Sequence, residues 1–320
     1  MEVAIWGAGA VGLGLASALA RPTSRVRLLV RDPETRRRLA DEGLRRSGRF
    51  GRIDVPPDWL RLESDARALA DGPPDFLLVC TKAFQGPSVA EALAPLAPAL
   101  AATSLVLCQN GWGNEAPFLA FWPGERLYHA RVITGFQRRA SNAVDVTAHA
   151  APIALGSLTG ADPEHVAPLA ARITEGGLPA ETTVDMHGVL WAKMLYNCAL
   201  NPLGALAGRR YGELAEDPHT RALLEAVVGE IFAVLESAEV CVAWPDAAAW
   251  LETFYRDLLP PTAAHESSML QDLRAGRRTE IEALCGAVER LGARHGVATP
   301  TVSALAALVR QAERRLERGA

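Results

Sequence analysis

Lysine is almost absent from this chain, and both lysines stand beside further polar side chains. Of the 33 basic residues only Lys82 and Lys193 are lysines, so arginine fills nearly every position where a surface cation is sufficient. A lysine ammonium in a low-dielectric site can release its proton, whereas a guanidinium keeps its own. A general acid needs that reversibility, so both lysines are candidate functional residues.

The second lysine belongs to an otherwise apolar stretch, residues 188–208. Apart from two aromatic ring tips, the polar side chains of this stretch are Lys193, Asn197 and Asn201. Their spacing of four residues puts them on one face of a helix. A helix that is apolar nearly all round is buried, and a buried ammonium without partners is costly. We therefore expect the stripe to line a cleft or a polar network; the alternative is a structural hydrogen-bond ladder between helices.

A glycine-rich segment at the start of the chain predicts a dinucleotide site. A strand-like run over 3–6 ends in a G-x-G-x-x-G match, and a helix pattern over 13–20 and a strand pattern over 25–30 follow. The glycines allow a tight turn and close approach of the backbone to a pyrophosphate, which faces free amides at the helix N-terminus. The alternative is a buried, alanine-rich hairpin with incidental glycines. The expected cofactor-binding residues are Gly7, Gly9, Ala10, Val11 and Gly12.

The end of the second strand pattern bears on which nicotinamide cofactor is bound. An acidic residue there holds the ribose 2′-hydroxyl of NAD, whereas an arginine accommodates the 2′-phosphate of NADP. Arg31 comes first and Asp32 follows, with three further arginines at 36–38. We favour NADP, with Arg31 on the phosphate. The competing interpretation makes Asp32 the residue that contacts the ribose and the arginines a solvated helix face.

Two further loops follow apolar strand patterns. Residues 76–80 lead into Thr81-Lys82, and residues 104–108 lead into Gln109-Asn110. Ligands bind at the carboxyl ends of strands in an open parallel sheet. Lys82 and Asn110 are therefore expected at the ligand-binding edge.

Alternating strand and helix patterns predict a doubly wound α/β domain over residues 1–184. After residue 185 alanine, leucine and charged residues dominate, which predicts an all-α domain over 185–320. The fold class is thus a Rossmann-type domain followed by a helical substrate domain. The expected helices, separated by prolines, are 186–207, 217–239, 246–257, 262–275, 279–295 and 301–317.

Composition excludes several classes of function. The chain has 320 residues, enough for two domains, and a formal charge of −4, which argues against a protein built mainly to hold nucleic acid. Five cysteines without a C-x-x-C pair suit a reducing compartment. The charge-free run 3–20 lacks a basic leader and is interrupted by glycines, so we expect a cytoplasmic protein with no membrane span. Serine-hydrolase, Walker and zinc-protease motifs are missing, and the scattered histidines predict no metal site.

The chain resembles the ketopantoate reductase (2-dehydropantoate 2-reductase) family nearly from end to end. The first motif of the resemblance is common to many dehydrogenases, whereas the last two are specific to this family. The motifs are Gly7-Ala8-Gly9-Ala10-Val11-Gly12, Thr81-Lys82-Ala83, Gln109-Asn110-Gly111, Trp191-Ala192-Lys193-Met194 with Asn197 and Asn201-Pro202-Leu203, and Ser267-Ser268-Met269-Leu270-Gln271-Asp272 with Gly276-Arg277 and Thr279-Glu280-Ile281-Glu282.

The resemblance implies NADPH-dependent reduction of a 2-oxo acid to a 2-hydroxy acid, here ketopantoate to pantoate in pantothenate biosynthesis. It makes Lys193 the general acid and Glu280 the residue that orients the lysine and the nascent hydroxyl beside the cofactor. By residue type alone, Glu280 is equally an ordinary carboxylate in the first turn of a helix. By the same resemblance Asn197, Asn201 and Ser268 hold the substrate, Asn110 bridges cofactor and substrate, Lys82 lies by the cofactor, and Arg31 takes its 2′-phosphate.

Two positions depart from the family pattern and concern the substrate. His265 stands where the family frequently has asparagine, and Arg131 lies in a stretch that is usually small and rich in glycine and threonine. An added arginine could accept a second acidic group, so reduction of a different 2-oxo acid is one alternative. A non-catalytic NADPH sensor is another, although a sensor needs neither Lys193 nor Glu280. A homodimer is possible for a helical domain with apolar faces.

Overall fold

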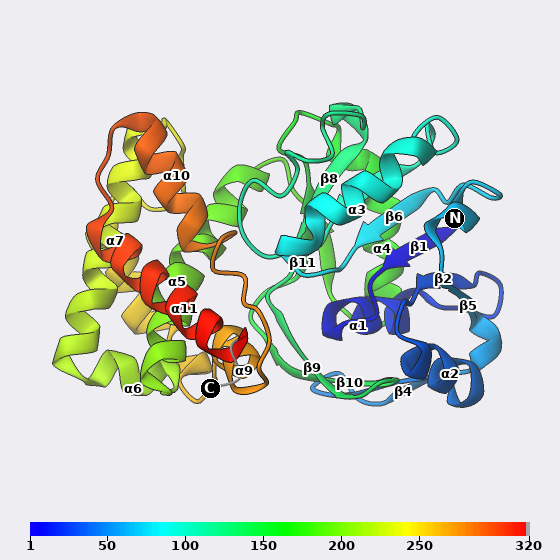
Figure 1. Cartoon of the computed structure of the whole chain (residues 1–320), viewed down its shortest axis with the longest axis horizontal. Helices are drawn as coiled ribbons and strands as arrows, with labels where there is room; N and C mark the ends of the chain where they lie inside the picture. Colours follow the sequence, from blue (N-terminus) through cyan, green and yellow to red (C-terminus); the bar gives the residue numbers. More distant parts are fainter. Residues whose placement is uncertain (318–320) are drawn as a thin grey trace. The chain divides into compact units, whose positions relative to one another are not determined.

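The chain folds into two units, which the computed structural model describes over residues 1–317 (Figure 1). The first unit comprises residues 1–109 and 114–186, and the second comprises residues 110–113 together with the chain from 187 onward. The short segment Asn110–Gly113 therefore leaves the strand-rich unit and is part of the helical one. Over the described residues, no helix combines the length and the apolar character that crossing a membrane requires.

An eight-stranded sheet forms the centre of the first unit, in the order β12-β11-β8-β7-β6-β1-β2-β5. The six strands from β8 to β5 pair in parallel, whereas β11 is antiparallel to β8 and parallel to β12. Every residue of β1, β2, β6 and β7 is buried, as expected for parallel strands covered on both faces. The strands are β1 (Val3–Trp6), β2 (Val26–Leu29), β5 (Leu60–Glu63), β6 (Phe76–Val79), β7 (Ser104–Leu107), β8 (Leu127–Arg131), β11 (Ile153–Gly156) and β12 (Ala180–Thr182).

The helices of this unit follow the strands, so the predicted fold class is confirmed. They are α1 (Ala10–Leu19), α2 (Pro33–Glu42), α3 (Gly86–Leu93) and α4 (Ala167–Glu175), with short 3₁₀ turns at Pro57–Trp59, Ala66–Leu69, Ala83–Gln85, Ala94–Leu96, Gly124–Arg126 and Pro163–Val166. Helix α1 is buried from Gly12 to Leu19, as its apolar sequence predicts, and its one polar side chain, Ser17, donates to Gly14 O at 2.6 Å.

A second, four-stranded sheet in the first unit was not predicted from the sequence. Its order is β4-β3-β10-β9, and its strands are β3 (Leu44–Gly48), β4 (Ile53–Val55), β9 (Thr134–Ala140) and β10 (Ala143–His149). These strands mix arginine and small polar residues with few apolar ones, so their sequence pattern is weak. The sheet packs on α1, where a Cβ on Gly14 would collide with the ring of Phe136.

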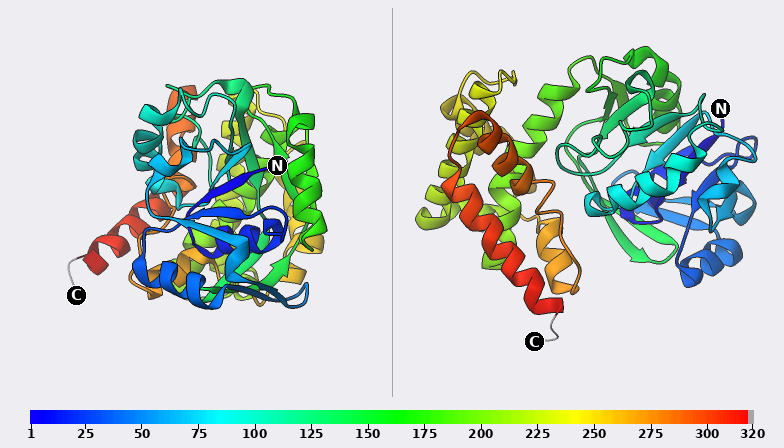
Figure 2. Two further views of the ribbon diagram at one scale, coloured as in Figure 1. Left: turned by 90° about the vertical axis from the view of Figure 1, so that its right-hand side faces the viewer. Right: turned by 45° about the horizontal axis from the view of Figure 1, so that its top comes forward.

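The second unit is all-helical, as predicted, and buries one apolar core that includes Trp191, Trp250 and Phe254. Helix α11 packs along α10 and α7 and contacts α9 (Figure 2). The helices are α5 (Met186–Ala207), α6 (Tyr211–Glu216), α7 (Pro218–Ser237), α8 (Ala247–Thr253), the π-helical η7 (Phe254–Leu258), the 3₁₀ turn η8 (Pro260–Thr262), α9 (Ser268–Arg274), α10 (Cys285–His295) and α11 (Pro300–Glu317).

The predicted starts of two helices, α9 and α10, are wrong, and helix α6 was not predicted. Helix α9 begins at Ser268 and not at 262, because the buried side chain of Ser267 caps it by accepting from Leu270 N at 3.0 Å. Helix α10 begins at Cys285 and not at 279. The segment 279–284 between these helices is irregular, which matters because it carries Glu280.

Candidate active site

The glycine-rich loop of the first unit has the geometry of an anion cradle. Gly7 has φ +113°, and a Cβ on Gly12 would collide with the carbonyl oxygen of Gly7, so both positions require glycine. The first hydrogen bond of α1 runs from Leu13 N to Gly9 O at 2.9 Å, and Gly9 caps the helix without a side chain. The preceding amides, on Ala10, Val11 and Gly12, are left for a ligand. The loop therefore fits a pyrophosphate.

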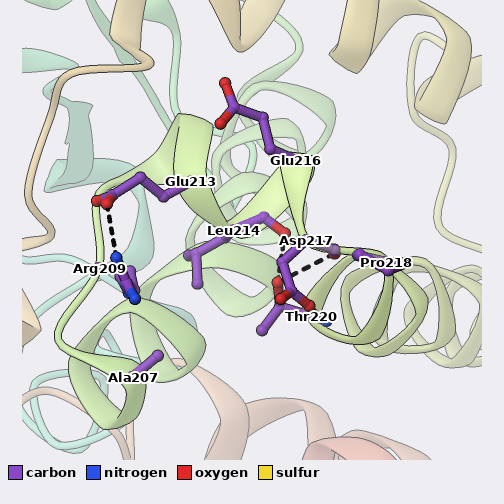
Figure 3. A pocket seen from close by; sticks show the side chains of 8 residues that line it. All are labelled: Ala207, Arg209, Glu213, Leu214, Glu216, Asp217, Pro218 and Thr220. Carbon is purple, nitrogen blue, oxygen red and sulfur yellow. Dashed lines mark hydrogen bonds and ion pairs between the residues drawn. The ribbon is translucent and has the colours of Figure 1, made fainter.

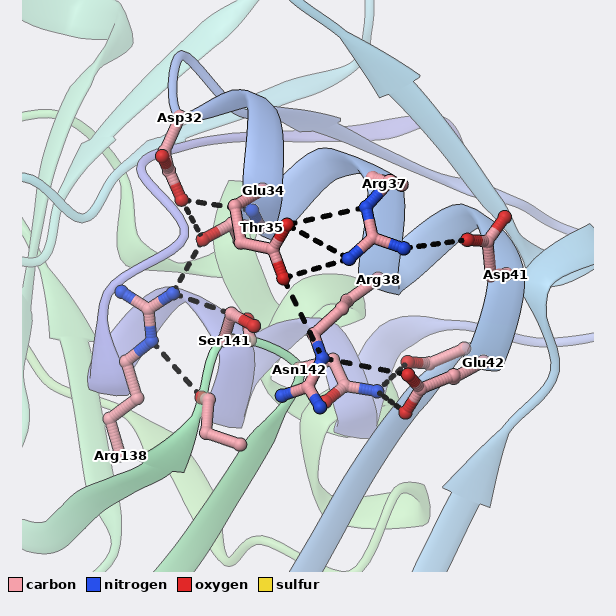
Figure 4. Close-up of polar contacts among 12 residues, drawn as sticks. Asp32, Glu34, Thr35, Arg37, Arg38, Asp41, Glu42, Arg138, Ser141 and Asn142 are labelled. Carbon is pink, nitrogen blue, oxygen red and sulfur yellow. Dashed lines mark hydrogen bonds and ion pairs between the residues drawn. The ribbon is translucent and has the colours of Figure 1, made fainter.

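Asp32 has a structural partner at the start of α2 (Figure 4). Its carboxylate accepts from Thr35 N at 2.9 Å and from the Thr35 hydroxyl, which in turn accepts from Arg138 at 2.7 Å. The hydrogen bonds from Thr35 lower the pKa of Asp32. A carboxylate held in this way serves as the helix N-cap.

The arginines on either side of Asp32 differ in what they contact. Arg37 pairs with Glu34 at 2.9 Å, and Arg38 pairs with Glu42 at 3.5 Å, so these two belong to a solvated helix face (Figure 4). Arg31 is exposed and forms no hydrogen bond or ion pair with the residues that the structure describes. Its guanidinium therefore remains available to an anion.

The loops after β6 and β7 are tied together by Gln109. Its side-chain nitrogen donates to Thr81 Oγ1 at 3.2 Å and to the carbonyl oxygen of Lys82 at 3.2 Å. Lys82 precedes the 3₁₀ turn at Ala83–Gln85 and is partly buried. The predicted placement of Lys82 directly after a parallel strand holds, and its contact with a cofactor stays a prediction.

In the helical unit, three predicted residues form one hydrogen-bonded relay. Lys193 Nζ donates to Asn110 Oδ1 at 2.5 Å, and Asn110 Nδ2 donates to Glu280 Oε2 at 2.9 Å. The amide faces the ammonium with its oxygen and the carboxylate with its nitrogen, so electrostatics fixes its orientation. Glu280 is 7% exposed. The alternative that Glu280 is a first-turn carboxylate is wrong, because α10 begins five residues later.

The backbone around Asn110 is fixed by the segment that carries Glu280. Trp112 N donates to Ala283 O at 2.9 Å, and the Trp112 ring lies 4.9 Å from the ring of Trp191. Gly111 has φ +99°, and a Cβ there would collide with Ala283. Glycine is therefore required for Asn110 to approach Glu280.

The remaining predicted residues of the helical unit lie in different surroundings. Lys193 and Asn197 are half-buried on α5, whereas Asn201 is 4% exposed. Ser268 is exposed as the first residue of α9. Within residues 1–317 the relay's hydrogen bonds include neither Asn197 nor Ser268, so their contact with substrate stays a prediction.

Tyr211 is a polar partner that the sequence reading missed. Its hydroxyl donates to Asn201 Oδ1 at 2.7 Å. If Tyr211 accepted instead, its own buried proton would lack an acceptor, so the donating orientation is favoured. The amide oxygen of Asn201, and not its nitrogen, therefore faces the Tyr211 hydroxyl. The Tyr211 hydroxyl therefore fixes the orientation of the Asn201 amide.

The two residues that depart from the family pattern are both partly buried. The His265 ring lies 5.2 Å from the ring of Tyr211, and burial lowers the pKa of His265. Arg131 ends β8 in the first unit, donates to Pro152 O at 3.4 Å, and has a pKa lowered by burial.

A surface hollow of about 610 Å³ in the helical unit has no residue of the relay in its lining. Figure 3 shows the side chains that line it. Three of its charged groups serve local structure: Glu213 pairs with Arg209 at 3.0 Å, and Asp217 caps α7 by accepting from His219 N and Thr220 N. The hollow is lined by Ala207, Arg209, Glu213, Leu214, Glu216, Asp217, Pro218 and Thr220.

Comparison with known proteins agrees with this geometry. The family model described as "Ketopantoate reductase PanE/ApbA" matches residues 3–160, and the model "Ketopantoate reductase PanE/ApbA C terminal" matches residues 185–313. The chain belongs to the ketopantoate reductase family.

Individual relatives cover the chain almost completely. A 2-dehydropantoate 2-reductase from Aquifex aeolicus is 33% identical over 315 residues, which is 98% of this chain and 97% of that protein. The crystal structure of a PanE/ApbA family ketopantoate reductase from Ralstonia eutropha has a TM-score of 0.85 at 30% identity and covers 99% of this chain and 100% of that one. D-mandelate dehydrogenase, solved with NADH and anilino(oxo)acetate, shares the fold with a TM-score of 0.83 at 24% identity, covering 99% and 100%.

Proposed function

We propose that this ketopantoate reductase family member reduces a 2-oxo acid to its 2-hydroxy acid with NADPH, and that ketopantoate is the substrate. The observation that carries the proposal is the Lys193–Asn110–Glu280 relay, which holds a half-buried ammonium in a defined direction. Full-length similarity to 2-dehydropantoate 2-reductases supports the choice of reaction and substrate.

The glycine-rich loop and Arg31 are the proposed cofactor-binding residues. Gly7, Gly12 and the amides at the start of α1 would hold the pyrophosphate. Arg31 would take the 2′-phosphate, since Asp32 is engaged as the cap of α2. Lys82 and Asn110 would also contact the cofactor. When bound, NADPH supplies the hydride for the carbonyl carbon.

Lys193 acts as the general acid. As the carbonyl carbon is reduced, negative charge develops on the carbonyl oxygen, and an ammonium aimed at that oxygen lowers the barrier and then transfers its proton. Asn110 fixes the ammonium by accepting one of its hydrogen bonds, and Glu280 fixes Asn110. The neutral amine that remains takes up a proton from water before the next turnover.

The amide side chains and Ser268 would hold the substrate's carboxylate and hydroxyl groups. The amide nitrogen of Asn201 is held ready for such an acceptor because Tyr211 occupies the amide oxygen. Asn197 lies one helical turn from both Lys193 and Asn201, so it would contact the same molecule.

Reduction of a different 2-oxo acid is the second candidate. His265 and Arg131 stand where the family pattern has other residues. His265 lies against Tyr211, whose hydroxyl sets the Asn201 amide, so this departure falls on the substrate-binding side chains.

We also propose that the reaction takes place in the cytoplasm. All five cysteines are free thiols, four of them buried, which suits a reducing compartment.

The test is NADPH oxidation with ketopantoate and a panel of branched, aromatic and dicarboxylic 2-oxo acids. We expect the highest kcat/KM with ketopantoate. A clear preference for another acid supports the second candidate. Absence of turnover with every acid, while NADPH still binds, contradicts both reductase proposals and favours a sensor.

A further inference from the structure

Glu280 lies on a segment that no regular secondary structure holds in place. Residues 279–284 form turns between α9 and α10. Within the segment, Ala283 N and Leu284 N donate to Glu280 O, both at 3.1 Å, and Ile281 N donates to Thr279 Oγ1 at 3.2 Å. From outside it, Trp112 N donates to Ala283 O at 2.9 Å. A catalytic carboxylate on such a segment needs restraint from elsewhere in the fold.

Further restraint, on both sides of Glu280, comes from the last helix, α11. Glu313 Oε1 accepts from Thr279 N at 2.6 Å, which ties the backbone directly before Glu280. Arg310 donates to both carboxylate oxygens of Glu282, from Nε at 2.6 Å and from Nη2 at 3.0 Å, which ties the segment two residues after Glu280. Two side chains of α11 therefore bind the chain on both sides of Glu280.

Arg310 is itself held by a second carboxylate. Its Nη2 donates to Glu289 of α10 at 2.6 Å. Hydrogen bonds from Arg310 lower the pKa of Glu282, and the two carboxylates raise the pKa of Arg310. Paired, bidentate contacts of this kind fix a guanidinium much better than a single exposed ion pair. Because α11 packs on α10 and α7, these contacts connect the 279–282 segment to the packed helices of the unit.

We propose that Glu313 and Arg310 are positioning residues that fix Glu280 for the reduction. The inference rests on the proposed function, because it assigns them to the same relay. Glu313 contacts Thr279 from 34 residues later in the chain, and Arg310 contacts Glu282 from 28 residues later. They act through the backbone of residues 279–282 and not on the substrate itself. A displacement of a catalytic group by about 1 Å can cost on the order of 10² in rate.

The test compares Glu313→Ala with Glu313→Gln. The glutamine keeps the oxygen that accepts from Thr279 N, whereas alanine leaves this amide without its partner. We expect Glu313→Ala to lower kcat by about ten- to a hundredfold with little change in KM, and Glu313→Gln to remain near wild type. Arg310→Ala should reproduce the loss. The control is Glu252→Ala, which removes an exposed carboxylate that pairs with Arg256 on the same unit.

Two readouts do not depend on turnover. Hydrogen exchange of the peptide that covers 279–284 should become faster in Glu313→Ala and stay unchanged in Glu313→Gln and in the control. The chain has only two lysines, so lysine labelled at ¹³Cε gives two NMR signals, which Lys82→Arg assigns. The Lys193 signal should shift in Glu313→Ala and in Arg310→Ala.

The outcomes separate this inference from the proposed function. Unchanged exchange and an unchanged Lys193 signal in Glu313→Ala would overturn the positioning role, whatever the activity. Faster exchange with unaltered kcat would overturn it as well. If the wild-type protein reduces no 2-oxo acid, the proposed function is contradicted, and so is the part of the inference that concerns the reduction. Hydrogen exchange and NMR still decide whether α11 holds residues 279–284 in place.

Discussion

Replacement of Lys193 by alanine tests the mechanism most directly. The structure aims this ammonium through a 2.5 Å hydrogen bond to Asn110, so the acid is positioned before substrate arrives. Removal of a positioned general acid costs about 10²–10⁴ in rate. At about 1.4 kcal/mol for each factor of ten, the barrier rises by about 3 to 5 kcal/mol. We expect kcat to fall by that factor while NADPH binding is retained.

Lys193→Arg separates proton donation from electrostatic attraction. Arginine keeps the positive charge but does not release a proton under ordinary conditions. If proton transfer is the essential step, the arginine variant loses activity nearly as severely as the alanine variant. If charge alone is sufficient, it retains much of the wild-type rate.

The assay follows NADPH consumption in a single turnover, so that product release does not mask the chemical step. NADPH affinity and the melting temperature are measured for each variant. Arg256→Ala is the control, because it removes an exposed cation of the same unit that pairs with Glu252 and Asp257. Near-normal turnover in Lys193→Ala would refute the mechanism.

Three further predictions concern cofactor choice, substrate binding and pH. Arg31→Ala should weaken NADPH binding far more than NADH binding; equal losses in titrations with both would point to Asp32 instead. Tyr211→Phe releases the amide of Asn201, so KM for the 2-oxo acid should rise by roughly two- to tenfold with kcat nearly constant, which corresponds to one hydrogen bond; an unchanged KM would contradict this role. Burial lowers the pKa of His265, so unfolded protein takes up this proton first as the pH falls through about 6.5. The stability contributed by neutral histidine is therefore complete above that pH and is lost below it. His265→Asn should shrink the drop in melting temperature between about pH 7.5 and about pH 5.5, and an identical drop in both proteins would argue against this explanation.

The sequence by itself determined the elements that are encoded by residues close together in the chain. The glycine turn, the buried strands before it and after it, and the lysine–asparagine stripe on α5 are all encoded by residues close together in the chain. Spacing and turn chemistry act over a few residues, so they can be read without knowing the fold. The two-part architecture followed from the same patterns.

Only the tertiary structure decided which side chains meet. The hydrogen bonds of the relay join residues 83 and 170 positions apart. They bring Asn110, from the end of a strand pattern, into the helical unit. The structure also places Glu280 outside a helix, where the sequence pattern had predicted the start of one, because α10 begins at Cys285.

The side chains that hold Asn201 and the Glu280 segment in place could not be predicted from the sequence either. Tyr211 reads as an ordinary aromatic residue, and Arg310 and Glu313 read as the solvated face of a terminal helix. Periodicity assigns a face to a residue but does not say which distant backbone amide or carboxylate lies opposite it. That pairing depends on how the helices pack against each other, so it exists only in the folded protein.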